Sequence, residues 1–167
     1  MMSRRTTLTG LGAAAAAFAG LRGLFTSQSV HAAQPARAYE VGHTDAEWRK
    51  LLTTQQYDVL RHAGTERPGS SPLNGEKRAG VFKCAGCVLP LFSSKTKFES
   101  GTGWPSFYEP LSKAAVDEDT DTTLGIKRTE VLCHRCGGHL GHVFDDGPKP
   151  TGLRYCMNGL ALAFTPA

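Results

Sequence analysis

Two features are scarce in most of this 167-residue sequence, and each absence excludes a class of protein. After the first 32 residues, no hydrophobic run is long enough to cross a membrane. Net charge is nearly absent as well. The first segment holds three of the 19 Lys and Arg residues and none of the 15 Asp and Glu, so 16 basic residues face 15 acidic ones in the remainder, a net charge of +1. This balance, without a patch that combines basic and aromatic residues, gives no support for nucleic-acid binding.

The first 32 residues have the layout of an export signal. A pair of arginines lies within Ser3-Arg-Arg-Thr-Thr-Leu8, a weakly hydrophobic Ala/Gly/Leu run continues to about Phe25, and Val30-His-Ala32 offers a small-residue cleavage site. The arginine pair is typical of the twin-arginine route. The alternative is an uncleaved membrane anchor, but Ala and Gly dominate the run and Arg22 interrupts it. We therefore expect residues 1–32 to direct export to the periplasm, with no stable membrane span in the mature protein.

Residues 33–42 read as a linker, and residues 43–167 are enough for one domain with one hydrophobic core. The domain is expected to begin with two short helices, because Thr44-Asp-Ala-Glu47 and Thr53-Thr-Gln-Gln56 both have the pattern of a capping box. The Gly, Pro and Ser residues between 65 and 75 then predict a surface loop.

From residue 80 onward the pattern changes to short apolar segments separated by Gly- and Pro-containing turns. Many short strands of this kind, after two small helices, predict a mainly β domain with antiparallel pairing. An acidic turn, most simply an exposed hairpin end, is expected at Asp117–Asp121. The expected strands lie at 80–84, 87–92, 95–99, 123–126, 129–133 and 160–164.

Four of the five cysteines form two Cys-x-x-Cys pairs, Cys84 with Cys87 and Cys133 with Cys136, and 45 residues separate the pairs. Two residues between thiols let both sulfurs point into one turn, and two such turns can close a four-sulfur zinc site. The long separation predicts that the pairs lie on separate hairpins, which the metal would clip together. The small residues that accompany each pair favour zinc over two alternatives, a pair of disulfides or two redox-active motifs.

The fifth cysteine, Cys156, has no partner in this scheme. A buried free cysteine is usually a small hydrophobic residue. An unpaired cysteine with histidines elsewhere in the chain is also a candidate nucleophile, and Arg154 and Asn158 are its near neighbours. Spacing alone leaves both interpretations open.

Four motifs emerge when the cysteines are read together with their neighbours. They are Cys84-x-x-Cys87, Ser100-Gly-Thr-Gly-Trp-Pro-Ser-Phe107, Cys133-x-x-Cys136-Gly-Gly-His-Leu-Gly-His142-Val-Phe-Asp-Asp-Gly147 and Arg154-Tyr-Cys156-Met-Asn158. Together they resemble the methionine-R-sulfoxide reductases, the B-type enzymes that return oxidised methionine to methionine. The resemblance extends from about Thr44 to Phe164, and the combination is far more specific than any single Cys-x-x-Cys pair.

The resemblance implies two antiparallel β-sheets, a structural zinc away from the active site, and a reduction in which Cys156 attacks the sulfur of methionine-R-sulfoxide in oxidised proteins or peptides. The sulfoxide oxygen must gain protons to leave as water, which suits a histidine. An indole face can accept the small methyl group while polar groups hold the oxygen, an asymmetry that selects one sulfur epimer. By similarity, His142 is the acid with His139 beside it, Asp146 and Asn158 orient this network, Trp104 packs on the methyl group, and Arg154 lies near the nucleophile.

One position departs from the family pattern, because Thr102 stands where members often have a second, resolving cysteine. With four cysteines on zinc, the sulfenic acid left on Cys156 must be reduced by an external thiol, and we expect a thioredoxin-like protein to supply it. Two other functions fit the cysteine pattern: a zinc-stabilised binding module in which Cys156 is merely buried, and a thiol–disulfide oxidoreductase that uses a Cys-x-x-Cys pair.

Overall fold

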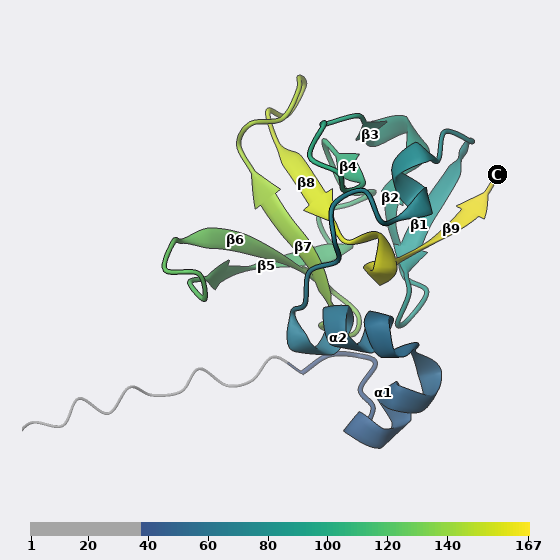
Figure 1. The fold of residues 1–167 in the computed structure, drawn as a ribbon. Coiled ribbons are helices and arrows are strands. Elements are labelled where there is room, and N and C mark those ends of the chain that lie inside the picture. Colours follow the sequence, from purple (N-terminus) through teal and green to yellow (C-terminus); the bar gives the residue numbers. More distant parts are fainter. Residues whose placement is uncertain (1–37) are drawn as a thin grey trace, which may run out of the picture. The chain divides into compact units, whose positions relative to one another are not determined.

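The computed structural model describes residues 38–167, and these form two antiparallel β-sheets with two short helices at one end (Figure 1). This confirms the predicted mainly β class. The predicted export segment, residues 1–32, and the first part of the predicted linker lie outside the described residues. Among the residues that are described, no helix combines the length and the apolar character that a membrane span requires.

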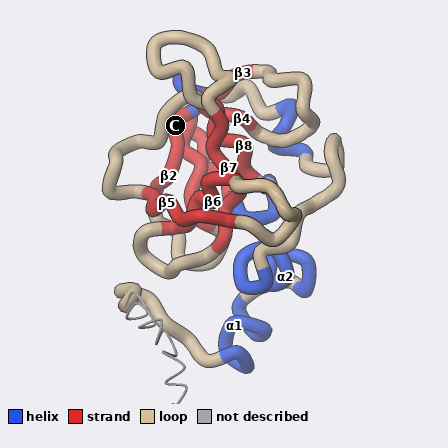
Figure 2. Tube along the Cα trace, turned by 90° about the vertical axis from the view of Figure 1, so that its left-hand side faces the viewer, coloured by secondary structure: helices blue, strands red, loops and turns tan. Residues whose placement is uncertain are grey.

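The two helices are α1, Asp45–Leu51, and α2, Thr54–His62. Both begin in the predicted capping boxes: a threonine hydroxyl accepts from the backbone three residues later, and the Glu or Gln there bonds back to the threonine N–H. Trp48 on α1 and Leu60 on α2 are buried, so each helix turns one apolar side toward the sheets. Figure 2 shows both helices together at the same end of the strands.

Nine strands make up the two sheets. The smaller sheet has the order β2-β1-β9 and the larger one β3-β4-β8-β7-β6-β5, with all neighbours antiparallel. Three short 3-10 helices, at Pro72–Gly75, Ser94–Thr96 and Gly159–Ala161, connect them. The strands are β1 Gly80–Cys84, β2 Pro90–Ser93, β3 Lys97–Phe98, β4 Ser106–Phe107, β5 Val116–Asp121, β6 Arg128–Cys133, β7 His139–Phe144, β8 Arg154–Met157 and β9 Leu162–Pro166.

Two local predictions are wrong, and both concern the β5–β6 hairpin. The segment expected to be an acidic turn belongs to strand β5, Val116–Asp121, and the segment 123–126, expected to be a strand, is the turn that follows it. Strand β5 lies at the edge of its sheet and pairs only with β6, and its acidic residues Glu118 and Asp119 are exposed. Charged residues are a common feature of edge strands because they discourage pairing with other chains. The turn itself is centred on Gly125, whose φ of 74° favours glycine.

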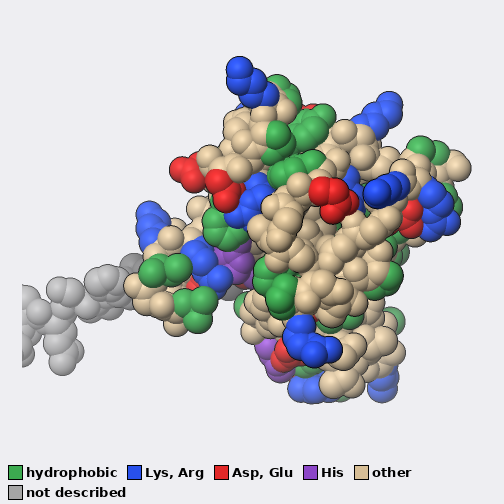
Figure 3. Space-filling view, turned by 45° about the horizontal axis from the view of Figure 1, so that its top comes forward, with side chains coloured by type: hydrophobic (Ala, Val, Ile, Leu, Met, Phe, Trp, Pro, Cys, Tyr) green, Lys and Arg blue, Asp and Glu red, His purple; other side chains and the backbone are tan. Residues whose placement is uncertain are grey.

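An aromatic cluster joins the two sheets. Phe82 and Phe92 come from the smaller sheet, and Phe107 and Tyr155 from the larger one. The Phe107 ring centroid lies 4.9 Å from that of Phe82 and 4.5 Å from that of Phe92. All four side chains are buried, so the cluster fixes how the sheets pack. On the surface, Figure 3 shows acidic and basic side chains interspersed over one face of the molecule, in keeping with the near-zero charge of this part of the chain.

Candidate active site and metal-binding site

The four paired cysteines come together, although the two pairs are distant in sequence. Their sulfur atoms all lie within 4.8 Å of one another; the Sγ atoms of Cys84 and Cys136 are 3.7 Å apart and those of Cys87 and Cys133 are 3.4 Å apart. These distances are far beyond the ~2.05 Å of a disulfide. They match the ~3.8 Å between sulfurs of a tetrahedral site with metal–sulfur bonds of ~2.3 Å. The four thiols therefore form a possible metal site.

The two pairs lie on separate hairpins, as the sequence predicted. Cys84 ends β1 and Cys133 ends β6, so the cluster joins the smaller sheet to the larger one. Helix α2 covers both turns: a Cβ added to Gly138 would lie 2.9 Å from the side chain of Leu60, and one added to Gly86 would lie 3.6 Å from it. The second turn therefore has no room for a side chain at position 138, whereas a Cβ at position 86 would make an ordinary contact.

Cys156 lies elsewhere, on β8 at the centre of the larger sheet. It is directly opposite Ser106 on β4 and His142 on β7, so the three side chains form a row on one face. Cys156 is partly exposed and lines a small cavity of about 120 Å³. The other residues that line this cavity are Thr65, Trp104, Arg128, Gly141, His142, Phe144 and Asn158.

A β-bulge brings both predicted histidines to this face. Residues three apart in a regular strand point to opposite faces. Here the register shifts, because Val131 pairs with Gly141 while Leu132 pairs with His139, which leaves Leu140 as an extra residue. The bulge places His139 and His142 on the same side, with ring centroids 5.4 Å apart.

Each histidine has a carboxylate partner from another strand of the sheet, Glu130 on the adjacent β6 and Asp121 on β5, one strand further away. His139 Nδ1 lies 2.6 Å from Glu130 Oε1, and His142 Nε2 lies 2.8 Å from Asp121 Oδ2. The pKa of His142 is lowered, first because burial disfavours the charged ring and then because of the positive charge of Arg128, while Asp121 opposes both. Sequence reasoning missed Glu130 and Asp121, because only the strand order of the sheet brings them to the histidines.

Arg154 and Asp146 form a bidentate ion pair beside Cys156. Both hydrogen bonds measure 2.8 Å, and the guanidinium carbon lies 4.5 Å from the ring centroid of Phe144. The pKa of Arg154 is raised by Asp146 first and further by the neighbouring Cys156, while the pKa of Asp146 is lowered by Arg154. Asp146 thus orients the arginine, and the acidic partners of the two histidines come from other strands.

Glu66 links two of the predicted site residues, although it lies in a segment predicted to be a surface loop. Its backbone N–H donates to Asn158 Oδ1 (3.0 Å), and its carbonyl accepts from the indole N–H of Trp104 (3.1 Å). The Asn158 amide also donates to the carbonyl of the bulged Leu140. Glu66 itself is only 7% exposed, and its carboxylate accepts from the N–H groups of Gly159 (2.5 Å) and Leu160 (3.1 Å).

Thr102, which stands where family members often have a second cysteine, lies next to Cys156. Its hydroxyl oxygen is 3.7 Å from Cys156 Sγ. The same hydroxyl is 2.8 Å from that of Ser100, which is in turn 2.7 Å from that of Ser106. The position that could hold a second thiol therefore belongs to a chain of hydroxyl groups.

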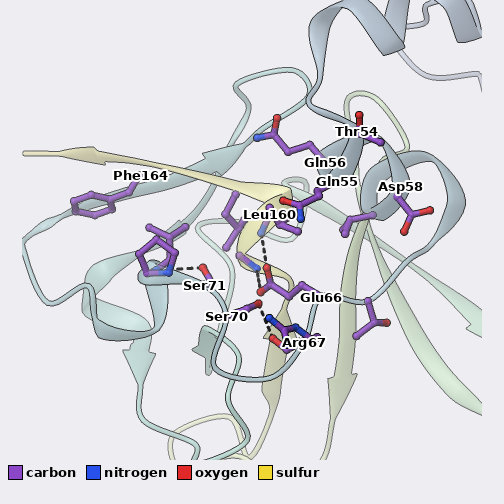
Figure 4. Close-up of a pocket in the computed structure, with 16 residues that line it drawn as sticks. Thr54, Gln55, Gln56, Asp58, Glu66, Arg67, Ser70, Ser71, Leu160 and Phe164 are labelled. Atoms are coloured by element: carbon purple, nitrogen blue, oxygen red, sulfur yellow. Dashed lines mark hydrogen bonds between the residues drawn. The ribbon is translucent and has the colours of Figure 1, made fainter.

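A larger cavity of about 840 Å³ lies near the site but does not include Cys156. Helix α2, the segment 65–73 and strand β9 form its walls. In Figure 4, the Glu66 carboxylate accepts a hydrogen bond from the N–H of Leu160 within this cavity. The cavity shares only Thr65 with the small cavity at Cys156. The volume of a cavity is therefore a poor guide to the site, because the smaller cavity is the one that Cys156 and His142 line.

Comparisons with known proteins agree with the site. A family model described as the SelR domain matches residues 52–166. The peptide methionine sulfoxide reductase MsrB of Agrobacterium fabrum is 54% identical over 127 residues, covering 76% of this chain and 94% of that protein. The MsrB proteins of Leptospira interrogans (53% over 126 residues; 75% and 96%) and Thiobacillus denitrificans (58% over 123 residues; 74% and 93%) are similarly close. The chain therefore belongs to the SelR-domain family, the B-type methionine-R-sulfoxide reductases.

Proposed function

We propose that this protein reduces methionine-R-sulfoxide in oxidised proteins and peptides, with Cys156 as the nucleophile. One observation carries the proposal: Cys156 lies directly across from His142 in a cavity that Trp104 also lines, in a chain whose relatives are named as peptide methionine sulfoxide reductases. A thiol, an imidazole and an indole face are the groups that this reduction needs.

In the proposed reaction, the Cys156 thiolate attacks the sulfoxide sulfur while the sulfoxide oxygen takes up a proton from His142. Transfer of the oxygen then leaves methionine and a sulfenic acid on Cys156, so the substrate sulfur is reduced and the cysteine sulfur is oxidised. Arg154 supports the thiolate, because it holds a fixed positive charge next to Cys156. The indole ring of Trp104 packs against the methyl group of the substrate. The hydrogen bond from the indole N–H to the Glu66 carbonyl holds this ring in place.

The sulfenic acid must then be reduced by thiols from outside the chain. Thr102 lies 3.7 Å from Cys156 Sγ, and the other four thiols lie together in the cluster. One external thiol attacks Cys156 with loss of water, and a second releases the mixed disulfide. A thioredoxin-like protein would supply both. After one turnover without reductant, the protein should gain sixteen daltons and react with dimedone. A loss of two daltons would instead mark an internal disulfide and refute this route.

Zinc is the metal that the four-cysteine cluster fits best. Its preference for four thiolates in a tetrahedron agrees with the distances between the sulfurs. The cluster joins two hairpins and contains none of the residues that line the Cys156 cavity. A zinc there would hold the fold together and take no part in the reduction.

Export by the twin-arginine route completes the proposal and places the enzyme in the periplasm. It is supported by Arg4 and Arg5 and by the Ala- and Gly-rich run that follows them. Replacement of both arginines by lysine should leave the precursor in the cytoplasm. Unchanged export would show that another route is used.

The reductase proposal is tested with the separate R and S epimers of a methionine sulfoxide peptide and a defined dithiol reductant. The wild-type protein should reduce the R epimer only, and Cys156→Ser should lose this activity while it keeps its metal. Activity in Cys156→Ser, or a folded and metal-loaded wild-type protein inactive on both epimers, would overturn the assignment. Inactivity on both epimers would favour a metal-stabilised binding module.

A further inference from the structure

The carboxylate of Asp121 reaches His142 from two strands away. Asp121 ends β5, His142 lies on β7, and β6 runs between them, yet Asp121 Oδ2 and His142 Nε2 are 2.8 Å apart. Both side chains are nearly buried, with 10% and 11% exposed. The contact adjoins the Cys156 cavity, which His142 and Arg128 both line.

Four donors hold the Asp121 carboxylate in place. The backbone N–H (2.9 Å) and the hydroxyl (2.7 Å) of Thr123 donate to Oδ1, while the guanidinium of Arg128 and the ring of His142 donate to Oδ2. The pKa of Asp121 is held well below its usual range, first by the Thr123 bonds and then by His142. An ionised carboxylate only accepts hydrogen bonds, so Nε2 of His142 must carry its proton.

This arrangement decides which nitrogen of His142 can exchange a proton with the substrate. Because Nε2–H is engaged by Asp121, Nδ1 is the nitrogen left to gain and lose a proton in a residue that lines the cavity. We propose that Asp121, fixed by Thr123 and Arg128, is the positioning residue for the catalytic acid, and that it directs proton delivery through Nδ1 of His142. The inference rests on the proposed reductase function, and it assigns to the β5–β6 hairpin a part in the reaction.

The charged groups around His142 predict opposite effects for two substitutions. Asp121 on β5, Arg128 on β6 and His139 on β7 act on the ring. Glu130 on β6 and Cys156 on β8 are the cross-strand neighbours of His142, and Arg154 on β8 lies next to Cys156. Asp121 raises the pKa of His142, whereas Arg128 lowers it. If the protonated ring is the acid, Asp121→Asn shifts the alkaline limb of the rate profile toward lower pH. Arg128→Gln shifts the same limb toward higher pH, since Thr123 still holds Asp121.

The kinetic test uses the full-length, metal-loaded protein and measures single-turnover reduction of the R epimer between pH 5 and 9. We expect Asp121→Asn to lower the rate at pH 7 by on the order of tenfold to a hundredfold, part of the 10²–10⁴ that general acids supply. Arg128→Lys keeps the positive charge, so the alkaline limb of its pH–rate profile should stay at the wild-type position. Asp119→Asn is the matched control, because Asp119 lies on the same strand and its carboxylate bonds only the backbone of Thr120. Profiles with the same midpoint for Asp121→Asn, Arg128→Gln and wild type would overturn the proposal.

A second measurement needs no activity. Nitrogen-15 NMR of the wild-type ring distinguishes the two neutral tautomers, and at high pH His142 should carry its proton on Nε2. Loss of this preference in Asp121→Asn supports the assignment; a proton on Nδ1 in the wild type refutes it, even if Asp121→Asn does not fold. Failure of the reductase function itself would look different, because wild type would then be inactive at every pH.

Discussion

At the scale of single residues, Glu66 shows how one buried side chain can hold several parts of a site. Its backbone bonds both Trp104 and Asn158, and its carboxylate bonds the first two N–H groups after Asn158. The loop that carries the indole and the strand end that follows the nucleophile are thus tied to the same residue. Glu66 takes no part in the proposed chemistry, but the positions of Trp104 and Asn158 depend on it.

We predict that Glu66→Ala lowers both stability and activity. Two buried N–H groups would lose their acceptor, which costs about 1–3 kcal/mol in the free energy of unfolding. The backbone carbonyl that accepts from Trp104 remains in the variant, but the segment that carries it loses its link to Gly159 and Leu160, so KM for the sulfoxide should rise. Urea unfolding and steady-state kinetics measure the two effects. Glu99→Ala is the control, because that side chain is 70% exposed and should change neither quantity. A Glu66→Ala protein with wild-type stability would contradict the role assigned to the carboxylate.

The residues that sequence reasoning found and those it missed differ in a physical way. Cys156, His142 and Trp104 belong to short motifs, and the structure brings all three to one cavity. Glu66 and Asp121 reach their partners across 92 and 21 positions of the chain, and only the fold brings them there. Their catalytic and positioning roles, like those of the motif residues, stay predictions until the variants are measured.

At the scale of secondary-structure elements, the bulge in β7 decides how the site is assembled. It turns His139 to the face that His142 occupies, and the carbonyl of the bulged Leu140 accepts from both the backbone and the side-chain amide of Asn158. The strand therefore meets β8 very closely at the next residue, Gly141. Its φ is 154°, and a Cβ there would lie 2.1 Å from the carbonyl oxygen of Cys156.

We predict that Gly141→Ala displaces the nucleophile strand. The added methyl group has no space, and such overpacking costs about 1–3 kcal/mol or more. The melting temperature should fall, and the single-turnover rate should fall further than stability explains, because Cys156 and His142 move apart. Gly75→Ala is the matched control, since nothing lies within 4 Å of a Cβ at that position. Equal melting temperatures and single-turnover rates for Gly141→Ala and Gly75→Ala would show that β7 and β8 can move apart with no loss of stability or activity.

The elements differ in how well the sequence predicts them. Both helices follow from local capping boxes, because each cap is completed within four residues. Strand β5 was mistaken for a turn because an edge strand buries little and its acidic residues resemble those of a turn. The bulge was also missed, since the spacing of two histidines does not reveal which strand register their neighbours adopt.

At the scale of the whole molecule, the cysteine cluster and the aromatic cluster are two separate links between the same pair of sheets. Phe82, Phe92, Phe107 and Tyr155 join the sheets through apolar contacts, which chelators do not affect. The thiols join them through β1 and β6, under the cover of helix α2. Metal removal therefore tests the second link while it leaves the first in place.

We predict one zinc ion per chain, and a large loss of stability when it is removed. The four sulfurs lie within 4.8 Å of one another, and structural zinc contributes on the order of 10 kcal/mol to folding. A chelator should lower the melting temperature sharply, and hydrogen exchange should increase first in α2 and in the two cysteine turns, because Leu60 packs against both turns. Cys87→Ser should behave like the chelated protein, whereas Cys156→Ser should keep its zinc and melt like wild type.

A metal-free protein that melts like the wild type would show that the apolar link alone holds the sheets together. If exchange instead increased first at β7 and β8, the cluster would be coupled to the active site, and its assignment as a purely structural site would be wrong.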